Sequence, residues 1–133
     1  MRHPPLLLEQ PRSIQVLLAV VLPALFGAVT GYFLGVSEGV YVVLSILGVL
    51  GGIGAGFDHL GAADGAKRGL IGGLLFGAFI LFAHEIHGAD AEAQLPEPAI
   101  LLVVITTVLG VLFGALGGWL RERSAQTDRG GRR

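Results

Sequence analysis

The 133-residue chain contains no cysteine, and only 14% of its residues are charged. The absence of cysteine excludes disulfides, thiolate nucleophiles and cysteine metal sites. Residues 13–37, 39–57, 69–83 and 98–120 contain no Asp, Glu, Lys, Arg or His. These stretches hold no pair of carboxylates and no Ser/His/Asp set, and the sequence has no phosphate-binding loop and no nucleic-acid surface. We therefore expect no enzyme, no cofactor and no nucleic-acid partner.

The four uncharged stretches are strongly apolar, in a chain that is 53% apolar with a mean hydropathy of +0.73. A membrane-spanning helix needs about 17–25 residues, so three stretches qualify directly, and the third must extend through polar residues at its ends. The sequence predicts an all-α integral membrane protein with helices at about 13–35, 39–59, 66–87 and 98–121. Residues 1–12 form an N-terminal segment, and residues 122–133 form a basic tail that we expect to be disordered.

Basic residues occur only in the N-terminal segment, the middle connection and the tail. The other two connections carry acidic residues and no Lys or Arg. Since cytoplasmic loops are enriched in Lys and Arg, this distribution predicts a multi-pass protein of the cell (inner) membrane with both termini in the cytoplasm. The basic tail would then face anionic lipid. The nine basic residues are Arg2, Arg12, Lys67, Arg68, Arg121, Arg123, Arg129, Arg132 and Arg133.

Each apolar stretch also carries three glycines spaced four residues apart. On a helix such glycines form a groove along one face, a glycine zipper, which lets another helix approach closely in lipid. We expect these glycines to pack helices together, some within one subunit and others between subunits of a homo-oligomer. The helix-packing glycines are Gly27, Gly31, Gly35, Gly48, Gly52, Gly56, Gly69, Gly73, Gly77, Gly110, Gly114 and Gly118.

The two halves of the chain resemble each other. The segment 25–28 matches 75–78, and the segment 47–50 matches 109–112, with glycines following at the same spacing. This pattern indicates an internal repeat of two tandem helical hairpins. Because each half holds two spans, the hairpins enter the membrane in the same direction and the repeat is parallel.

Polar side chains concentrate at the predicted ends of the helices. His84, Glu85 and His87 lie near the outer end of the third helix, where they form an interfacial cap or an acidic pore mouth. The spacing of the two histidines suits a divalent metal, but the further ligands that such a site needs are not evident, so we predict no metal site. Glu38 lies in the other outer turn.

Asp58 closes the second helix on the cytoplasmic side, near Lys67 and Arg68. It is expected to pair with these bases, or alternatively to act in proton or ion transfer. The hydroxyls within the spans are expected to bond back to their own helices or to line a pore. They belong to Thr30, Ser45, Thr106 and Thr107.

Two functions are consistent with these features. The first is a small homo-oligomeric membrane channel or transport protein, with an inorganic cation as a possible partner and a pore lined by glycine backbone and hydroxyls. The second is a non-conducting membrane scaffold or accessory subunit that assembles through its glycines. In both cases the partners are membrane lipid and other copies of the chain.

Overall fold

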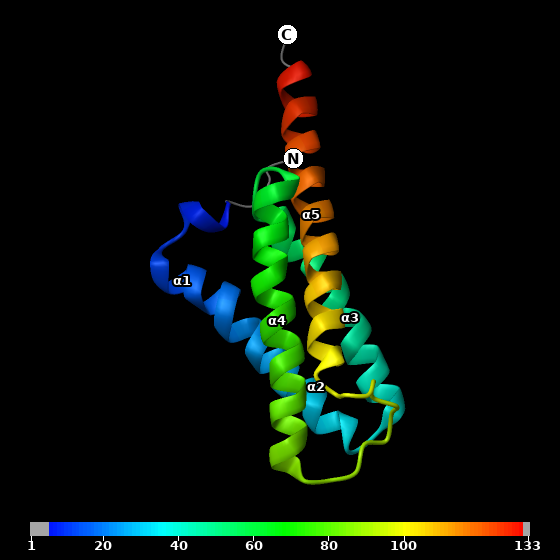
Figure 1. The fold of residues 1–133 in the computed structure, drawn as a ribbon. Helices are drawn as coiled ribbons and strands as arrows, with labels where there is room; N and C mark the ends of the chain where they lie inside the picture. Colours follow the sequence, from blue (N-terminus) through cyan, green and yellow to red (C-terminus); the bar gives the residue numbers. More distant parts are fainter. Residues whose placement is uncertain (1–5, 132–133) are drawn as a thin grey trace.

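A computed structural model describes residues 6–131, which form helices joined by short connections (Figure 1). The predicted features at residues 1–5 and 132–133 lie outside the described residues. The elements are η1 (Leu7–Glu9), α1 (Arg12–Val16), η2 (Leu17–Val21), α2 (Leu22–Leu34), α3 (Glu38–Phe57), α4 (Ala62–His87) and α5 (Leu101–Gly130).

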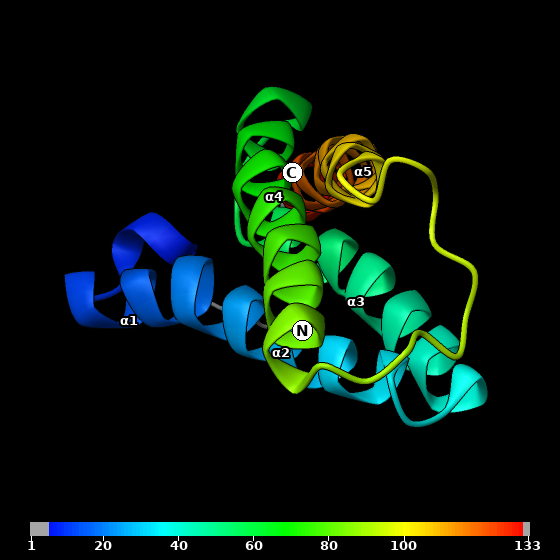
Figure 2. The same cartoon turned by 60° about the horizontal axis from the view of Figure 1, so that its bottom comes forward.

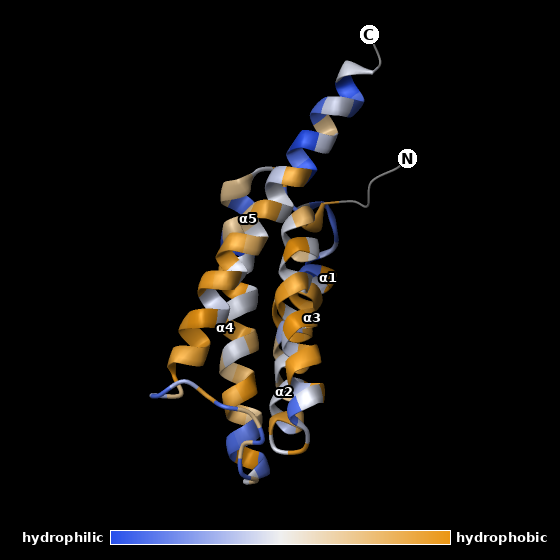
Figure 3. Cartoon of the chain, turned by 90° about the vertical axis from the view of Figure 1, so that its right-hand side faces the viewer, coloured by the Kyte–Doolittle hydropathy of each residue, from blue (hydrophilic) through white to orange (hydrophobic). Residues whose placement is uncertain are grey.

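Four helices are long and apolar enough to cross a membrane, which indicates a multi-pass membrane protein. The first runs from Arg12 to Leu34 and comprises α1, η2 and α2 in succession; the others are α3, α4 and α5. Colouring by hydropathy shows that apolar residues cover most of the bundle, whereas hydrophilic residues gather at its two ends (Figure 3).

Both termini and the α3–α4 connection lie at one end of the bundle, and the α2–α3 and α4–α5 connections lie at the other (Figure 1). Viewed obliquely from this second end, α4 and α5 lie side by side, and the first helix passes behind α4, so that the end of α2 lies beside the start of α3 (Figure 2). Among residues 6–131, the end with the α3–α4 connection carries Arg12, Lys67, Arg121, Arg123 and Arg129, so we call it the basic end and the opposite one the outer end.

Two helix starts differ from the sequence-based bounds. Helix α4 begins at Ala62 rather than near residue 66, after Gly61 with a φ of 95°, because the small residues that follow let this first turn approach α5. Helix α5 begins at Leu101 rather than at Pro98. Its approach is a tight turn, in which the Leu101 N–H donates to the Pro98 carbonyl at 3.0 Å.

The predicted disordered tail is helical up to Gly130. Residues 121–129 include Arg, Glu, Ala and Gln, which have good helix propensities, and the apolar span supplies the nucleus on which they extend. At 30 residues, α5 is about 45 Å long, more than the roughly 30 Å of a hydrocarbon core. Its hydrophilic end projects beyond the other helices (Figure 3).

Helices α4 and α5 touch through glycines on both sides. A Cβ at Gly69 would overlap the carbonyl of Gly110, and a Cβ at Gly114 would overlap the carbonyl of Gly65. The same holds for Gly118 against the carbonyl of Gly61. Backbone therefore lies directly on backbone along this pair, and no side chain larger than hydrogen fits at these positions.

The glycines of the first two spans contact other segments of the same chain. A Cβ at Gly27 or Gly31 would overlap the carbonyl of Phe76 or Ile80 in α4, whereas one at Gly48 would overlap the Phe76 ring. Gly52 is less tightly packed, since its Cβ would lie 3.5 Å from the Cβ of Phe113. All twelve predicted packing glycines have a neighbour within their own chain, while packing of some of them between subunits stays a prediction.

The most deeply buried side chains lie toward the outer end. Leu34, Tyr41, Phe76 and Ile80 form one cluster, and Leu95 from the α4–α5 connection packs against it together with Ala93. The N–H of Glu92 donates to the Leu34 carbonyl at 2.8 Å, which ties the connection to the end of α2. The outer end of the bundle is therefore filled and covered by this connection.

Candidate functional site

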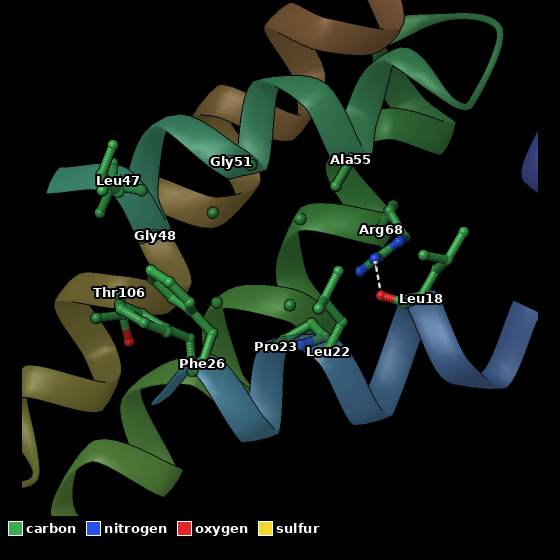
Figure 4. A pocket seen from close by; sticks show the side chains of 17 residues that line it. Leu18, Leu22, Pro23, Phe26, Leu47, Gly48, Gly51, Ala55, Arg68 and Thr106 are labelled. Atoms are coloured by element: carbon green, nitrogen blue, oxygen red, sulfur yellow. Dashed lines mark hydrogen bonds between the residues drawn. The ribbon is translucent and has the colours of Figure 1, made fainter. Parts of the chain in front are cut away.

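A cavity of about 260 Å³ lies between the first helix, α3, α4 and α5, on the basic-end side of this cluster (Figure 4). Its lining is almost wholly apolar or glycine, and it includes Leu22, Phe26, Leu47, Phe76 and Gly51. The two side chains in the lining with polar groups are Arg68 and Thr106. The hydroxyl of Thr106 already donates to the Val103 carbonyl at 3.0 Å.

Arg68 places a positive charge inside the bundle. The side chain is 6% exposed, and its Nη2 donates to the backbone carbonyl of Leu18 at 2.6 Å. Its Nε and Nη1 are buried and have no hydrogen-bond partner among the described residues. Gly72, one turn along α4, leaves room beside Nη1, because a Cβ there would lie 3.2 Å from that nitrogen.

The Leu18 carbonyl is available because of a local irregularity in the first helix. In the π-helical turn η2, the N–H of Leu22 donates to the carbonyl of Leu17 instead of that of Leu18. The π-type donor for Leu18 would be residue 23, which is proline and has no N–H. Arg68 satisfies the carbonyl that this arrangement leaves without a backbone donor, as a backbone group in lipid requires.

Sequence reasoning missed this site because it assigned Arg68 to the cytoplasmic connection. The structure places it seven residues into α4, counted from Ala62. Two signals were present in the sequence. Gly61 and Gly65 continue the four-residue spacing of the α4 glycines, so the helix extends past Arg68, and Pro23 within the first span implies an unpaired carbonyl one turn earlier.

Asp58 caps α3 at the basic end, where its backbone carbonyl accepts the N–H of Leu7 at 3.0 Å. Burial raises the pKa of the Asp58 carboxyl above its ordinary value of 3.8, while the charges of His59, Arg68 and Arg121 lower it less strongly. The expected pairing of Asp58 with the bases of the connection stays a prediction, and the hydrogen bond of Arg68 goes to the Leu18 carbonyl.

The outer-end candidates do not converge on the cavity. Glu38 lies in the first turn of α3 and Glu85 lies near the end of α4, and both are exposed. The predicted pore-mouth residues thus surround an outer end that the buried cluster fills.

The two histidines contribute to packing at that end. The ring of His87 stacks on Tyr32 with centroids 4.5 Å apart, and its Nδ1 lies 3.0 Å from the position of a Cβ at Gly35. His84 has a buried Nδ1 with no hydrogen-bond partner among residues 6–131. Within that same part of the chain, no three His, Asp or Glu side chains gather in a way that could hold a metal ion.

The hydroxyls of three threonines bond back to their own helices. Thr30 donates to the Phe26 carbonyl at 2.8 Å, and Thr107 donates to the Val103 carbonyl at 2.6 Å, as Thr106 also does. Of these three, Thr106 lines the cavity.

Comparison of the chain with protein-family models, curated proteins and solved structures finds no match.

Proposed function

We propose that the chain is a small multi-pass membrane transport protein whose substrate site is the cavity at Arg68. One observation carries this proposal: Nε and Nη1 of a buried guanidinium lie at an apolar cavity with no partner among the described residues. An ionisable side chain inside a membrane bundle is expensive to bury and ordinarily marks the path of a substrate or ion. Because this charge is positive, the substrate is an anion or carries an anionic group.

The proposed mode of action is alternating exposure of this site, because the buried cluster of Leu34, Tyr41, Phe76 and Ile80 lies between the cavity and the outer end. Cation preference stays a prediction for the exposed acidic residues of the outer end, where Glu38 and Glu85 lie. Inside the bundle, Arg68 would repel a cation.

Transport is tested by flux into liposomes that contain the purified protein. Under a potassium diffusion potential, we expect a voltage-driven flux of at least one anion among chloride, phosphate, acetate and octanoate. Arg68→Gln should abolish this flux, whereas Lys67→Gln, which removes an exposed positive charge from the neighbouring position, should leave it intact. Equal flux in the wild type and Arg68→Gln, or a flux confined to cations, would rule out the proposal.

The orientation in the membrane is proposed from the distribution of basic residues, with the basic end in the cytoplasm of the cell (inner) membrane. Single cysteines at Ala91 and Gln126, both exposed and at opposite ends, should react with an impermeant thiol reagent from opposite sides. Ala91 should be labelled from outside. Labelling of both positions from the same side would disprove this topology.

We also retain two predictions about assembly, namely the tandem repeat of two hairpins and the homo-oligomer. The intramolecular contacts of the twelve glycines support their role in packing helices within the subunit, so subunits would meet through other faces. The alternative of a non-conducting membrane scaffold or accessory subunit that assembles through its glycines also stays a prediction. Mass determination in detergent tests the oligomer, and a monomeric mass would exclude it.

A further inference from the structure

The chemistry around Arg68 narrows the class of substrate. We infer that the cavity binds a single-chain amphiphilic carboxylate, of the size of octanoate, which enters sideways from the bilayer. This inference rests on the proposed function, since it names the substrate of the same site. Three properties of the cavity support it: the scarcity of donors, the apolar lining and the position of the opening.

The cavity offers few hydrogen-bond donors to an anion. Besides Arg68, its one polar side chain is Thr106, whose hydroxyl proton is already used on the Val103 carbonyl. A small hydrophilic anion that gave up its hydration shell here would find a single charged partner and an otherwise apolar wall, which is unfavourable. An amphiphile needs polar partners only at its head, which would bind Arg68; Nε and Nη1 of this guanidinium are buried and have no hydrogen-bond partner among residues 6–131.

The rest of the cavity suits an alkyl chain. A volume of about 260 Å³ corresponds to roughly nine molecules of liquid water at about 30 Å³ each, which is too small for a two-chain phospholipid and close to the size of a medium-chain fatty acid. The lining by Leu, Phe and Gly makes burial of methylene groups favourable. The guanidinium lies among these apolar groups, between the first helix and α3 (Figure 4).

The cavity opens toward the surface that a bilayer would cover. Leu22 of α2 is 54% exposed and Leu47 of α3 is 53% exposed, and Gly51 beside them in α3 is exposed as well. All three line the cavity, so they mark its rim between these two helices. A ligand that partitions into the membrane reaches this rim directly, whereas an inorganic ion would have to cross hydrocarbon.

The rim provides a matched pair of variants that keep Arg68. Gly51 and Gly54 are both exposed glycines of α3, and a Cβ at either would have no neighbour within 4 Å. Only Gly51 lines the cavity. Gly51→Phe should therefore block the opening without disturbing the backbone or the bond between Arg68 and Leu18, while Gly54→Phe adds the same ring outside the cavity.

The test is calorimetric titration of octanoate into the protein in phosphatidylcholine nanodiscs, with empty discs subtracted. We expect saturable binding that Arg68→Gln weakens by about tenfold or more, since a bond to a charged group is lost. Gly51→Phe should weaken it similarly, whereas Lys67→Gln and Gly54→Phe should not. Acetate, which lacks the tail, and octanol, which lacks the charge, should both bind at least about tenfold more weakly.

Several results would overturn the inference. Equal octanoate binding by the wild type, Arg68→Gln and Gly51→Phe would show that the cavity is not the site. Acetate binding as tight as that of octanoate would leave an anion site without amphiphile selectivity, and the transport proposal would survive. Displacement of octanoate when phosphatidylglycerol is added to the disc would assign the site to a lipid headgroup. Arg68-dependent octanoate binding without any flux would support the inference and overturn transport.

Discussion

The two hairpins of the bundle use the same glycine spacing in different ways. In the second hairpin, α4 and α5 meet backbone to backbone, with glycines of one helix on glycines of the other. In the first hairpin, the glycines of α2 and α3 face α4, α5 and the ring of Phe76, and the cavity opens between the two helices. The two helices of the second hairpin are therefore close-packed on each other, whereas the two helices of the first hairpin pack on the second one, through backbone contacts at Gly27, Gly31 and Gly56 and through the bond from Arg68 to Leu18.

This difference suggests which part of the protein moves. Two helices in backbone-to-backbone contact cannot shift easily, because a displacement of one helix brings it into steric overlap with the other. The first helix contains a π-helical turn and a proline at the level of the cavity, which are features where membrane helices bend. Opening of the cavity would thus come from the first helix bending at this turn.

The difference in packing between the hairpins is tested most directly at Gly114 and Gly52, two positions that the predicted repeat makes equivalent. Gly114→Ala should destabilise the fold by about 1–3 kcal/mol or more, because its Cβ would overlap the Gly65 carbonyl. Gly52→Ala should change stability by less than about 0.5 kcal/mol, since the new methyl group finds ordinary contact distance and alanine favours the helix.

Thermal unfolding in detergent measures both variants. Gly54→Ala is the control, because its Cβ would meet nothing within 4 Å and it tests helix propensity alone. Comparable losses for Gly52→Ala and Gly114→Ala would remove the distinction between the hairpins.

A double-mutant cycle between Arg68 and Pro23 tests how the first helix is attached to α4. Arg68→Met leaves the Leu18 carbonyl without its donor, which opposes the gain from removing a buried charge. In a Pro23→Ala background, residue 23 regains an N–H that can serve this carbonyl. We expect the change in the free energy of unfolding caused by Arg68→Met to be less favourable, by about 1 kcal/mol, in the chain that keeps Pro23 than in the Pro23→Ala background. Additive effects on unfolding would contradict the link between the proline and the arginine.

A smaller effect concerns Asp58, at the basic end between the hairpins. Its raised pKa means that the folded chain holds this proton more tightly than the unfolded chain does, so stability falls as pH rises from about 3.8 through the raised value. Asp58→Asn should remove this part of the pH dependence. Unfolding measured at pH 4 and pH 7 checks the sign, and a wild type that gains more stability than the variant over this interval would contradict it.

The smallest effect is expected at the outer end, where Glu38 and Glu85 belong to different hairpins and are both exposed. Replacing both by Gln should change stability by only a few tenths of a kcal/mol. If the two carboxylates concentrate cations at a pore mouth, the double substitution should also lower cation flux at low salt. At high salt the effect should be small, because salt screens the carboxylates; the Debye length is already only about 8 Å at physiological ionic strength. Flux unchanged at every salt concentration would count against an acidic mouth.

The amino-acid pattern alone indicates a multi-pass membrane protein. Four long uncharged apolar stretches, interrupted by charge only at their ends, leave few alternatives to four helices, because lipid requires every backbone group to be bonded internally. The sequence also indicates that Glu38, Glu85 and His87 lie at helix ends, because polar groups are expensive to bury in lipid, and the structure has them at the end opposite the basic one. None of this depended on which helix touches which.

The partner of each glycine and the position of the buried charge follow from how the helices pack in three dimensions. A four-residue spacing marks a face of a helix but does not say whether another glycine, a phenylalanine ring or lipid will cover it. From the sequence, Arg68 is one of the basic residues of a connection. In the structure it lies inside the bundle, because the first turns of α4 pack on α5. Its bond to Leu18 joins residues 50 positions apart, and such contacts follow from packing in three dimensions rather than from any local pattern.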